Sequence, residues 1–261
     1  MDMPSHLILN NTCIKMICYD AYTELDYKYK VPYEQQTVSE ITKKKFCDYN
    51  VKIYQYFKTV NKWEYLIECV KNHVIDNNKY SWLNKFYLSN KSELKEYLKL
   101  FLTNDYDKKN TLVLFGTMNT GKSLLARSIG YFFKTIFVSN LEQSSSFFFS
   151  QFHGFNLAII EEPAINLNTV EDYKKVLAGQ PVSASRKGEN VKVVIDEIPI
   201  LITTNNLSLG KGNLCAADEG VLANRCRYIV LNNVVFPDVY LSPFDVIKYL
   251  IYIFFSYPTD V

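Results

Sequence analysis

Apolar residues recur at three- and four-residue steps between Lys52 and Leu102, and this spacing predicts amphipathic helices. The recurring positions are Tyr56, Trp63, Leu66, Val70 and Val74, followed by Leu94, Tyr97, Leu98 and Phe101. The turn-rich segment 104–110 ends this pattern. Residues 1–50 mix apolar and charged positions without a clean period, so they predict no particular element.

Beyond residue 110, short apolar runs alternate with helical stretches. The pattern predicts strands at 111–115, 135–139, 156–160, 198–203 and 227–231, and helices at 122–133 and 169–178. Residues 181–194 alternate in polarity and predict a hairpin with its tip near Lys187 and Gly188. Alternation of strands with helices is typical of an α/β domain built on a mostly parallel sheet.

The expected organisation is a smaller, mainly helical domain followed by this α/β domain. Four segments are predicted: 1–50 without assignment, 51–104 helical, 105–235 α/β, and 236–261 as a C-terminal helical segment. The longest apolar run, near 246–256, is too short to span a bilayer and contains Lys248. We therefore expect a soluble protein with no membrane partner.

Composition narrows the function classes further. The chain has 261 residues, of which 48% are hydrophobic and 21% charged, values typical of a globular protein. Its net charge of +2 creates no overall field for nucleic acid, so any such contact must come from a local patch. The six cysteines show no metal-ligand spacing and predict reduced thiols in an intracellular protein.

The clearest motif is Gly116-Thr-Met-Asn-Thr-Gly121-Lys122-Ser123, which matches G-x-x-x-x-G-K-[ST] with a strand before it and a helix after it. In such a loop the backbone N–H groups wrap phosphates, Lys122 reaches the terminal phosphates, and the Ser123 hydroxyl ligates magnesium. The motif predicts an ATP and Mg²⁺ site formed by Gly116, Thr117, Met118, Asn119, Thr120, Gly121, Lys122 and Ser123.

Two further sets of polar residues follow predicted strands. Glu161 and Glu162 end the apolar run 156–160, and charges there lie at the carboxyl edge of the sheet, where α/β folds bind ligands. We expect Glu161 to hold Mg²⁺, largely through water, and Glu162 to polarise the attacking water. Asn205 follows the strand 198–203 and would orient that water. Taken alone, an asparagine there is more often a turn former, and its position after the other motifs favours the catalytic role.

Together with LAGQPVSASRKGEN at 177–190, these motifs resemble superfamily 3 helicases, the replicative helicases of small DNA viruses within the AAA+ ATPases. The order of glutamate pair, Gly-Gln turn, Lys-Gly hairpin and Thr-Thr-Asn is most similar to parvovirus non-structural replication proteins. The resemblance covers about 105–235. It implies an AAA+ P-loop fold and ATP-dependent DNA unwinding for viral genome replication, by a ring expected to be a hexamer in the host nucleus.

The resemblance also implies residue roles outside the nucleotide site. Lys187, with Arg186 beside it, matches the hairpin tip that grips single-stranded DNA, although a lysine at an exposed tip is by itself usually only solvated. Arg225 matches the arginine that reaches the neighbouring subunit's γ-phosphate, and Arg227 is the alternative. The helical segment 51–104 corresponds either to an oligomerisation domain or to a simple packing subdomain.

One departure from the family pattern limits the expected activities. Parvovirus replication proteins carry an endonuclease with a His-hydrophobe-His metal motif, whereas His6, His73 and His153 are widely separated here. We expect no nicking by this chain, and a separate nicking or origin-binding protein as a partner. The alternative function is an ATP-binding assembly or scaffold subunit of a replication or packaging complex. The intact pair of Glu161 and Glu162 argues against a decayed site.

Overall fold

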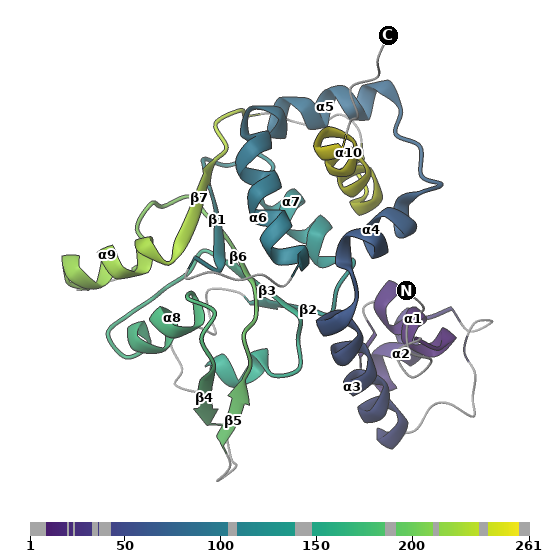
Figure 1. Cartoon of the computed structure of the whole chain (residues 1–261), viewed down its shortest axis with the longest axis horizontal. Helices are drawn as coiled ribbons and strands as arrows, with labels where there is room; N and C mark the ends of the chain where they lie inside the picture. The colour runs from purple at the N-terminus through teal and green to yellow at the C-terminus, as the bar shows by residue number, and fades with distance from the viewer. Residues whose placement is uncertain are drawn as a thin grey trace.

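A five-stranded parallel sheet forms the centre of the molecule, with helices on both of its faces (Figure 1). The computed structural model describes residues 9–19, 21–22, 24–32, 36, 43–103, 109–138, 148–185, 192–210, 214–234 and 240–255. Strand order is β2-β3-β6-β1-β7, with every neighbouring pair parallel. The strands are β1 (Thr111–Phe115), β2 (Thr135–Val138), β3 (Leu157–Glu161), β6 (Ile200–Thr204) and β7 (Cys226–Val230). The predicted mostly parallel sheet is confirmed.

Alternate residues of β1, β3 and β6 enter two different apolar clusters. Leu112 and Leu114 of β1 pack on the face covered by α7 (Lys122–Gly130) and α10 (Pro243–Phe255), whereas Val113 packs on the face covered by α8 (Val170–Val176). Because both faces are buried, these strands are continuous apolar runs rather than alternating ones. That property made them visible in the sequence.

The first part of the chain is helical. The helices between residues 52 and 102 agree with the predicted spacing, whereas those within residues 11–50 were not predicted. Its helices are α1 (Asn11–Cys18), α2 (Glu24–Lys30), α3 (Lys43–Thr59), α4 (Lys62–Val70), α5 (Asn77–Tyr87), the 3₁₀ turn η4 (Leu88–Asn90) and α6 (Lys91–Thr103). Asn10, Asn61 and Asp76 cap the starts of α1, α4 and α5, each accepting a bond from a backbone N–H in the first turn. Such caps contribute about 1 kcal/mol each to helix stability.

The C-terminal segment returns to these helices. Ser242 and Asp245 exchange reciprocal side-chain and backbone hydrogen bonds at 2.8 and 3.2 Å, a capping box that starts α10. The apolar face of α10 then packs against α4, α5, α6 and α7. The expected packing of this segment as a helix is confirmed. Among the described residues, none of the helices combines the length and the apolar character needed to cross a bilayer.

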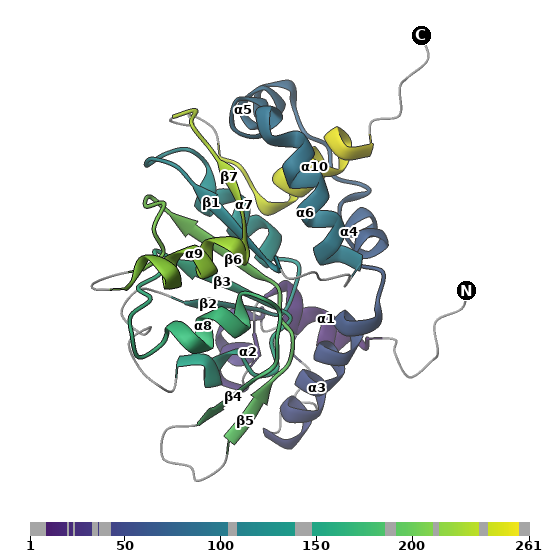
Figure 2. The ribbon, with the colours of Figure 1, turned by 60° about the vertical axis from the view of Figure 1, so that its left-hand side comes forward.

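Strands β4 (Val182–Ser185) and β5 (Lys192–Ile195) form a separate antiparallel pair beyond α8, which Figure 2 shows from the side. Their register aligns Ser185 with Lys192, so the two arms of the predicted hairpin are present. Arg186 and Lys187, predicted at its tip, lie outside the described residues. The remaining elements are η6 (Phe148–Phe152) and α9 (Ala216–Asn224), and α9 was not predicted.

Candidate nucleotide site at the carboxyl edge of the sheet

Three motifs predicted to act together are brought together by the strand order. The glycine loop follows β1, the glutamate pair ends β3, and Asn205 follows β6. Strands β3, β6 and β1 are adjacent and parallel, so their carboxyl ends lie side by side at one edge. The site therefore follows directly from the topology of the sheet.

The conformation of the glycine loop requires glycine at positions 116 and 121. Gly121 precedes α7 with φ +80°, in the left-handed region, where a side chain is strained. A Cβ there would lie 2.9 Å from a Phe86 ring carbon and 3.0 Å from the Tyr87 hydroxyl. A Cβ at Gly116 would collide with the Leu231 carbonyl oxygen. The loop thus approaches its neighbours too closely for any larger residue at either position.

A cavity of about 250 Å³ lies over this loop and is lined by residues 119–124 together with Phe86. Phe86 belongs to α5, so the mainly helical part of the chain supplies one wall of the cavity. Tyr87, the next residue, donates a hydrogen bond of 2.8 Å to the Gly121 carbonyl. Neither residue was predicted to belong to the site, because they lie 30 and 29 positions before the motif and carry no local signal.

Lys122 is buried at the base of this cavity, with 8% of its surface exposed. Its ammonium donates to the Gly116 carbonyl at 2.8 Å, the Thr117 carbonyl at 2.5 Å and the Asn205 side-chain oxygen at 3.0 Å. Burial lowers the pKa of Lys122, and the nearby Glu162 charge partly opposes that shift. The lysine predicted to reach phosphates is thus held by loop carbonyls that phosphate oxygens can replace.

Glu162 is fixed by the neighbouring strand β6. Its two carboxylate oxygens accept hydrogen bonds from the Asn205 backbone N–H at 3.0 Å and from the Thr204 hydroxyl at 3.2 Å. Its φ of +47° is unusual for a residue with a side chain, and such strain is concentrated at functional sites. The structure therefore brings Lys122, Glu162 and Asn205 into one hydrogen-bonded group.

Glu161 and Ser123 lie at the same edge and fit a magnesium ion. Ser123 is exposed and lines the cavity, and Glu161 is partly exposed at the end of β3. Hydroxyl and carboxylate oxygens are the hard ligands that Mg²⁺ takes together with phosphates and water. Glu161 is contacted by Arg127 of α7, whose Nη2 lies 3.0 Å from Glu161 Oε1. Arg127 was not predicted from the sequence.

The two candidate arginines differ sharply in their surroundings. Arg227 donates to Glu96 of α6 at 2.7 Å and is therefore engaged within its own chain. Arg225 is partly exposed, and its side chain has no partner within the part of the chain that the structure describes. It immediately precedes β7, at the amino edge of the sheet, away from the Lys122 of the same chain.

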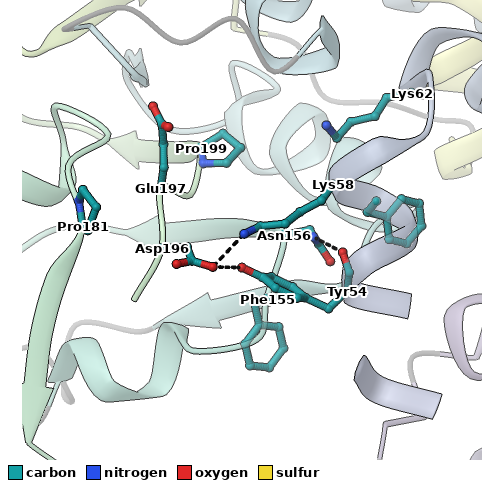
Figure 3. A pocket seen from close by; sticks show the side chains of 10 residues that line it. Tyr54, Lys58, Lys62, Phe155, Asn156, Pro181, Asp196, Glu197 and Pro199 are labelled. Atoms are coloured by element: carbon teal, nitrogen blue, oxygen red, sulfur yellow. Dashed lines mark hydrogen bonds and ion pairs between the residues drawn. The ribbon is translucent and has the colours of Figure 1, made fainter. Parts of the chain in front are cut away.

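A second cavity of about 380 Å³ lies at the amino edge, between α3 and the residues that precede β3 and β6 (Figure 3). Tyr54 and Lys58 of α3 both donate to Asp196 at 2.7 Å, directly after β5. The Asn156 amide donates to the Tyr54 carbonyl at 3.1 Å. These bonds tie α3 to the base of the hairpin, and this cavity takes no part in the nucleotide site.

Comparisons with known proteins agree with this geometry. The family model described as "Parvovirus non-structural protein NS1" matches residues 6–207. The chain is 30% identical to replication protein E1 of Macaca mulata papillomavirus 1 over 150 residues. The aligned region covers 57% of this chain and 22% of that protein. It is 28% identical over 145 residues to initiator protein NS1 of porcine parvovirus (strain Kresse), covering 51% of this chain and 22% of that protein. The chain thus spans about a fifth of the length of these curated relatives.

Solved structures share the fold. A structure of JCV helicase with a bound acetamide compound matches with a TM-score of 0.52 at 16% identity, covering 80% of this chain and 62% of that chain. Another structure of JCV helicase gives a TM-score of 0.51 at 14% identity, covering 87% and 71%. These matches show that the architecture is that of viral helicase structures. With the family match extending over most of its length, the chain belongs to the parvovirus non-structural protein NS1 family.

Proposed function

We propose that this chain is an ATP-driven DNA helicase that unwinds DNA for viral genome replication as a ring-shaped oligomer. The observation that carries the proposal is the hydrogen-bonded group of Lys122, Glu162 and Asn205, assembled from three adjacent strand ends beside a glycine loop. Related proteins are named as a replication protein and an initiator protein, which supports a role in replication.

In the proposed reaction, backbone N–H groups of the glycine loop and the Lys122 ammonium bind the phosphates. Ser123 and Glu161 would hold Mg²⁺, which supplies neutralisation of the charge that develops on the phosphoryl oxygens. Glu162, already fixed by Thr204 and Asn205, accepts the proton of the attacking water.

Asn205 contacts two other residues of the proposed site. Its side-chain oxygen holds Lys122, and its backbone N–H holds Glu162. When phosphates take over Lys122, the Asn205 amide becomes available to orient the attacking water. Nucleotide binding and water positioning are thereby coupled through one residue.

In the proposed ring, a cation from a neighbouring subunit would neutralise the charge that develops on the γ-phosphate. Arg225 fits this role because it is unpaired among those residues and lies at the opposite edge. Coupling to DNA would pass through Lys187 and Arg186, between the arms β4 and β5.

Strand-displacement assays on a forked DNA test the proposal directly. The wild-type chain should unwind the fork only with ATP and Mg²⁺, and Lys122→Ala should abolish unwinding and ATP hydrolysis together. Full hydrolysis in Lys122→Ala would overturn the site assignment. Nucleotide binding by the wild type without any unwinding would favour the assembly or scaffold function.

A further inference from the structure

Arg127 of α7 and Glu161 at the end of β3 form an ion pair. Arg127 lies on α7, the helix that begins at Lys122, and its Nη2 is 3.0 Å from Glu161 Oε1. The Arg127 side chain is 64% exposed and that of Glu161 34% exposed, so the pair is open to solvent and to an incoming ion.

The adjacent glutamates Glu161 and Glu162 are held in different ways. Glu162 is fixed by hydrogen bonds from Thr204 and Asn205, neither of which carries a charge. Glu161 is held by a guanidinium, which carries a full positive charge at any physiological pH. Glu161, the carboxylate assigned to magnesium, is thus paired directly with a cation, whereas the Lys122 ammonium is linked to Glu162 through Asn205.

A guanidinium and Mg²⁺ compete for such a carboxylate. Mg²⁺ binds oxygens at about 2.0–2.1 Å in a strict octahedral arrangement. A cation hydrogen-bonded to the same oxygen repels the metal and occupies its approach. Coordination of Mg²⁺ by Glu161 Oε1 would therefore compete with the bond from Arg127. Until the metal binds, Arg127 neutralises Glu161 and limits the orientations available to its carboxylate.

We propose that Arg127, a positioning residue that acts through Glu161, competes with magnesium for the Glu161 carboxylate and thereby sets the Mg²⁺ concentration at which the site fills. This inference rests on the proposed function, because it requires Glu161 to be a magnesium ligand. Arg127 itself does not touch the reacting atoms. Because Arg127 competes with the metal, removing its side chain should make Mg²⁺ bind more tightly.

The test is a Mg²⁺ titration of the binding of a fluorescent, slowly hydrolysed ATP analogue to the full chain. In Arg127→Met the half-saturating Mg²⁺ concentration should fall between about two- and fivefold, since exposed ion pairs are weak. Arg127→Gln keeps a hydrogen-bond donor without the charge and should behave in the same way. The affinity for the analogue without Mg²⁺ should stay within about twofold, and the difference should shrink at high salt because exposed charges are screened.

Lys175→Met is the matched control, because Lys175 is an exposed lysine on α8 and its loss changes the net charge equally. A half-saturating Mg²⁺ concentration that is unchanged or higher in Arg127→Met would overturn the inference, as would an equal fall in Lys175→Met. Analogue binding by the wild type that is indifferent to Mg²⁺ would overturn this inference alone. Failure of the wild type to bind the analogue at all would instead overturn the proposed function.

Discussion

The Lys122 ammonium lies 3.0 Å from the side-chain oxygen of Asn205, which links the glycine loop after β1 to the end of β6. The same asparagine donates its backbone N–H to Glu162 at 3.0 Å. One residue therefore contacts both the lysine assigned to the phosphates and the glutamate assigned to the water. In the proposed reaction, this arrangement would couple occupancy of the phosphate site to activation of the water.

Asn205→Ala should separate nucleotide binding from hydrolysis. The substitution removes the side-chain contact to Lys122 and leaves the backbone bond to Glu162 in place. We expect kcat to fall about 100-fold or more, in the range lost when a positioned proton-transfer geometry is disrupted, while nucleotide affinity is retained.

Asn206→Ala is the control for that substitution, because the side chain of Asn206 is exposed and only its backbone is bonded to Thr204. Steady-state kinetics with a direct binding measurement decides the matter. An unchanged kcat in Asn205→Ala would remove the asparagine from the mechanism.

Gly121→Ala should abolish nucleotide binding. The added Cβ would meet the Phe86 ring and the Tyr87 hydroxyl, and the left-handed backbone would cost a further 1–2 kcal/mol, roughly. Gly220→Ala is a matched control in α9, where a Cβ meets nothing within 4 Å and alanine favours the helix. Thermal unfolding and nucleotide titration should show losses in Gly121→Ala alone. Normal binding by Gly121→Ala would mean that the loop tolerates a displacement from α5.

Lys134→Met should stabilise the protein. Lys134 is 6% exposed, and its ammonium lies 5.5 Å from the Tyr22 ring and 5.3 Å from the Phe155 ring. Burial lowers its pKa to about 8. Because the unfolded chain keeps the higher lysine pKa, it binds more protons between about pH 8 and pH 10.5, so this group makes stability rise with pH over that window.

At pH 7 the buried charge therefore opposes folding by an amount on the order of 3 kcal/mol. Denaturant unfolding of the wild type and Lys134→Met at pH 7 and pH 9.5 should show the variant more stable at pH 7, with the difference smaller at pH 9.5. A difference that does not change with pH would show that the lysine titrates normally.

Mixing two inactive variants tests the role of Arg225. Lys122→Ala lacks the phosphate lysine, and Arg225→Ala lacks the cation expected to reach the neighbour. In a mixed ring, some interfaces combine the Lys122 of one subunit with the Arg225 of another, so ATPase activity should reappear on mixing. Arg227→Ala should instead behave as a stability variant, because Arg227 is bonded to Glu96 of its own chain. Continued inactivity of the mixture would argue against an arginine acting between subunits.

The sequence predicted the site residues that follow the strands, but not the residues of other elements that pack against them. Runs such as 111–115 and 156–160 were visible because they are buried on both faces, and the polar residues after them had to meet once the strands were parallel. Phe86 was not predictable, because its contact with Gly121 is set by tertiary packing of α5. Helix α9 was not predicted, because Leu222 is its one buried residue and its other residues show no periodic spacing of apolar side chains.

The pairing of Arg127 with Glu161 illustrates a further limit. The two residues lie 34 positions apart, on α7 and β3, and no spacing rule links them. Only the packing of α7 over the sheet places the guanidinium beside the carboxylate. The same holds for the burial of Lys134, since a lysine carries no signal in sequence that separates a solvated one from a buried one.

The central claim is that DNA controls ATP hydrolysis at this edge of the sheet within an assembled ring. The most direct measurement is ATP turnover by the purified chain with and without single-stranded DNA, with the mass of the species determined in the same solution. The account predicts a ring-sized species whose turnover rises on addition of DNA. A monomer whose turnover is indifferent to DNA would contradict it.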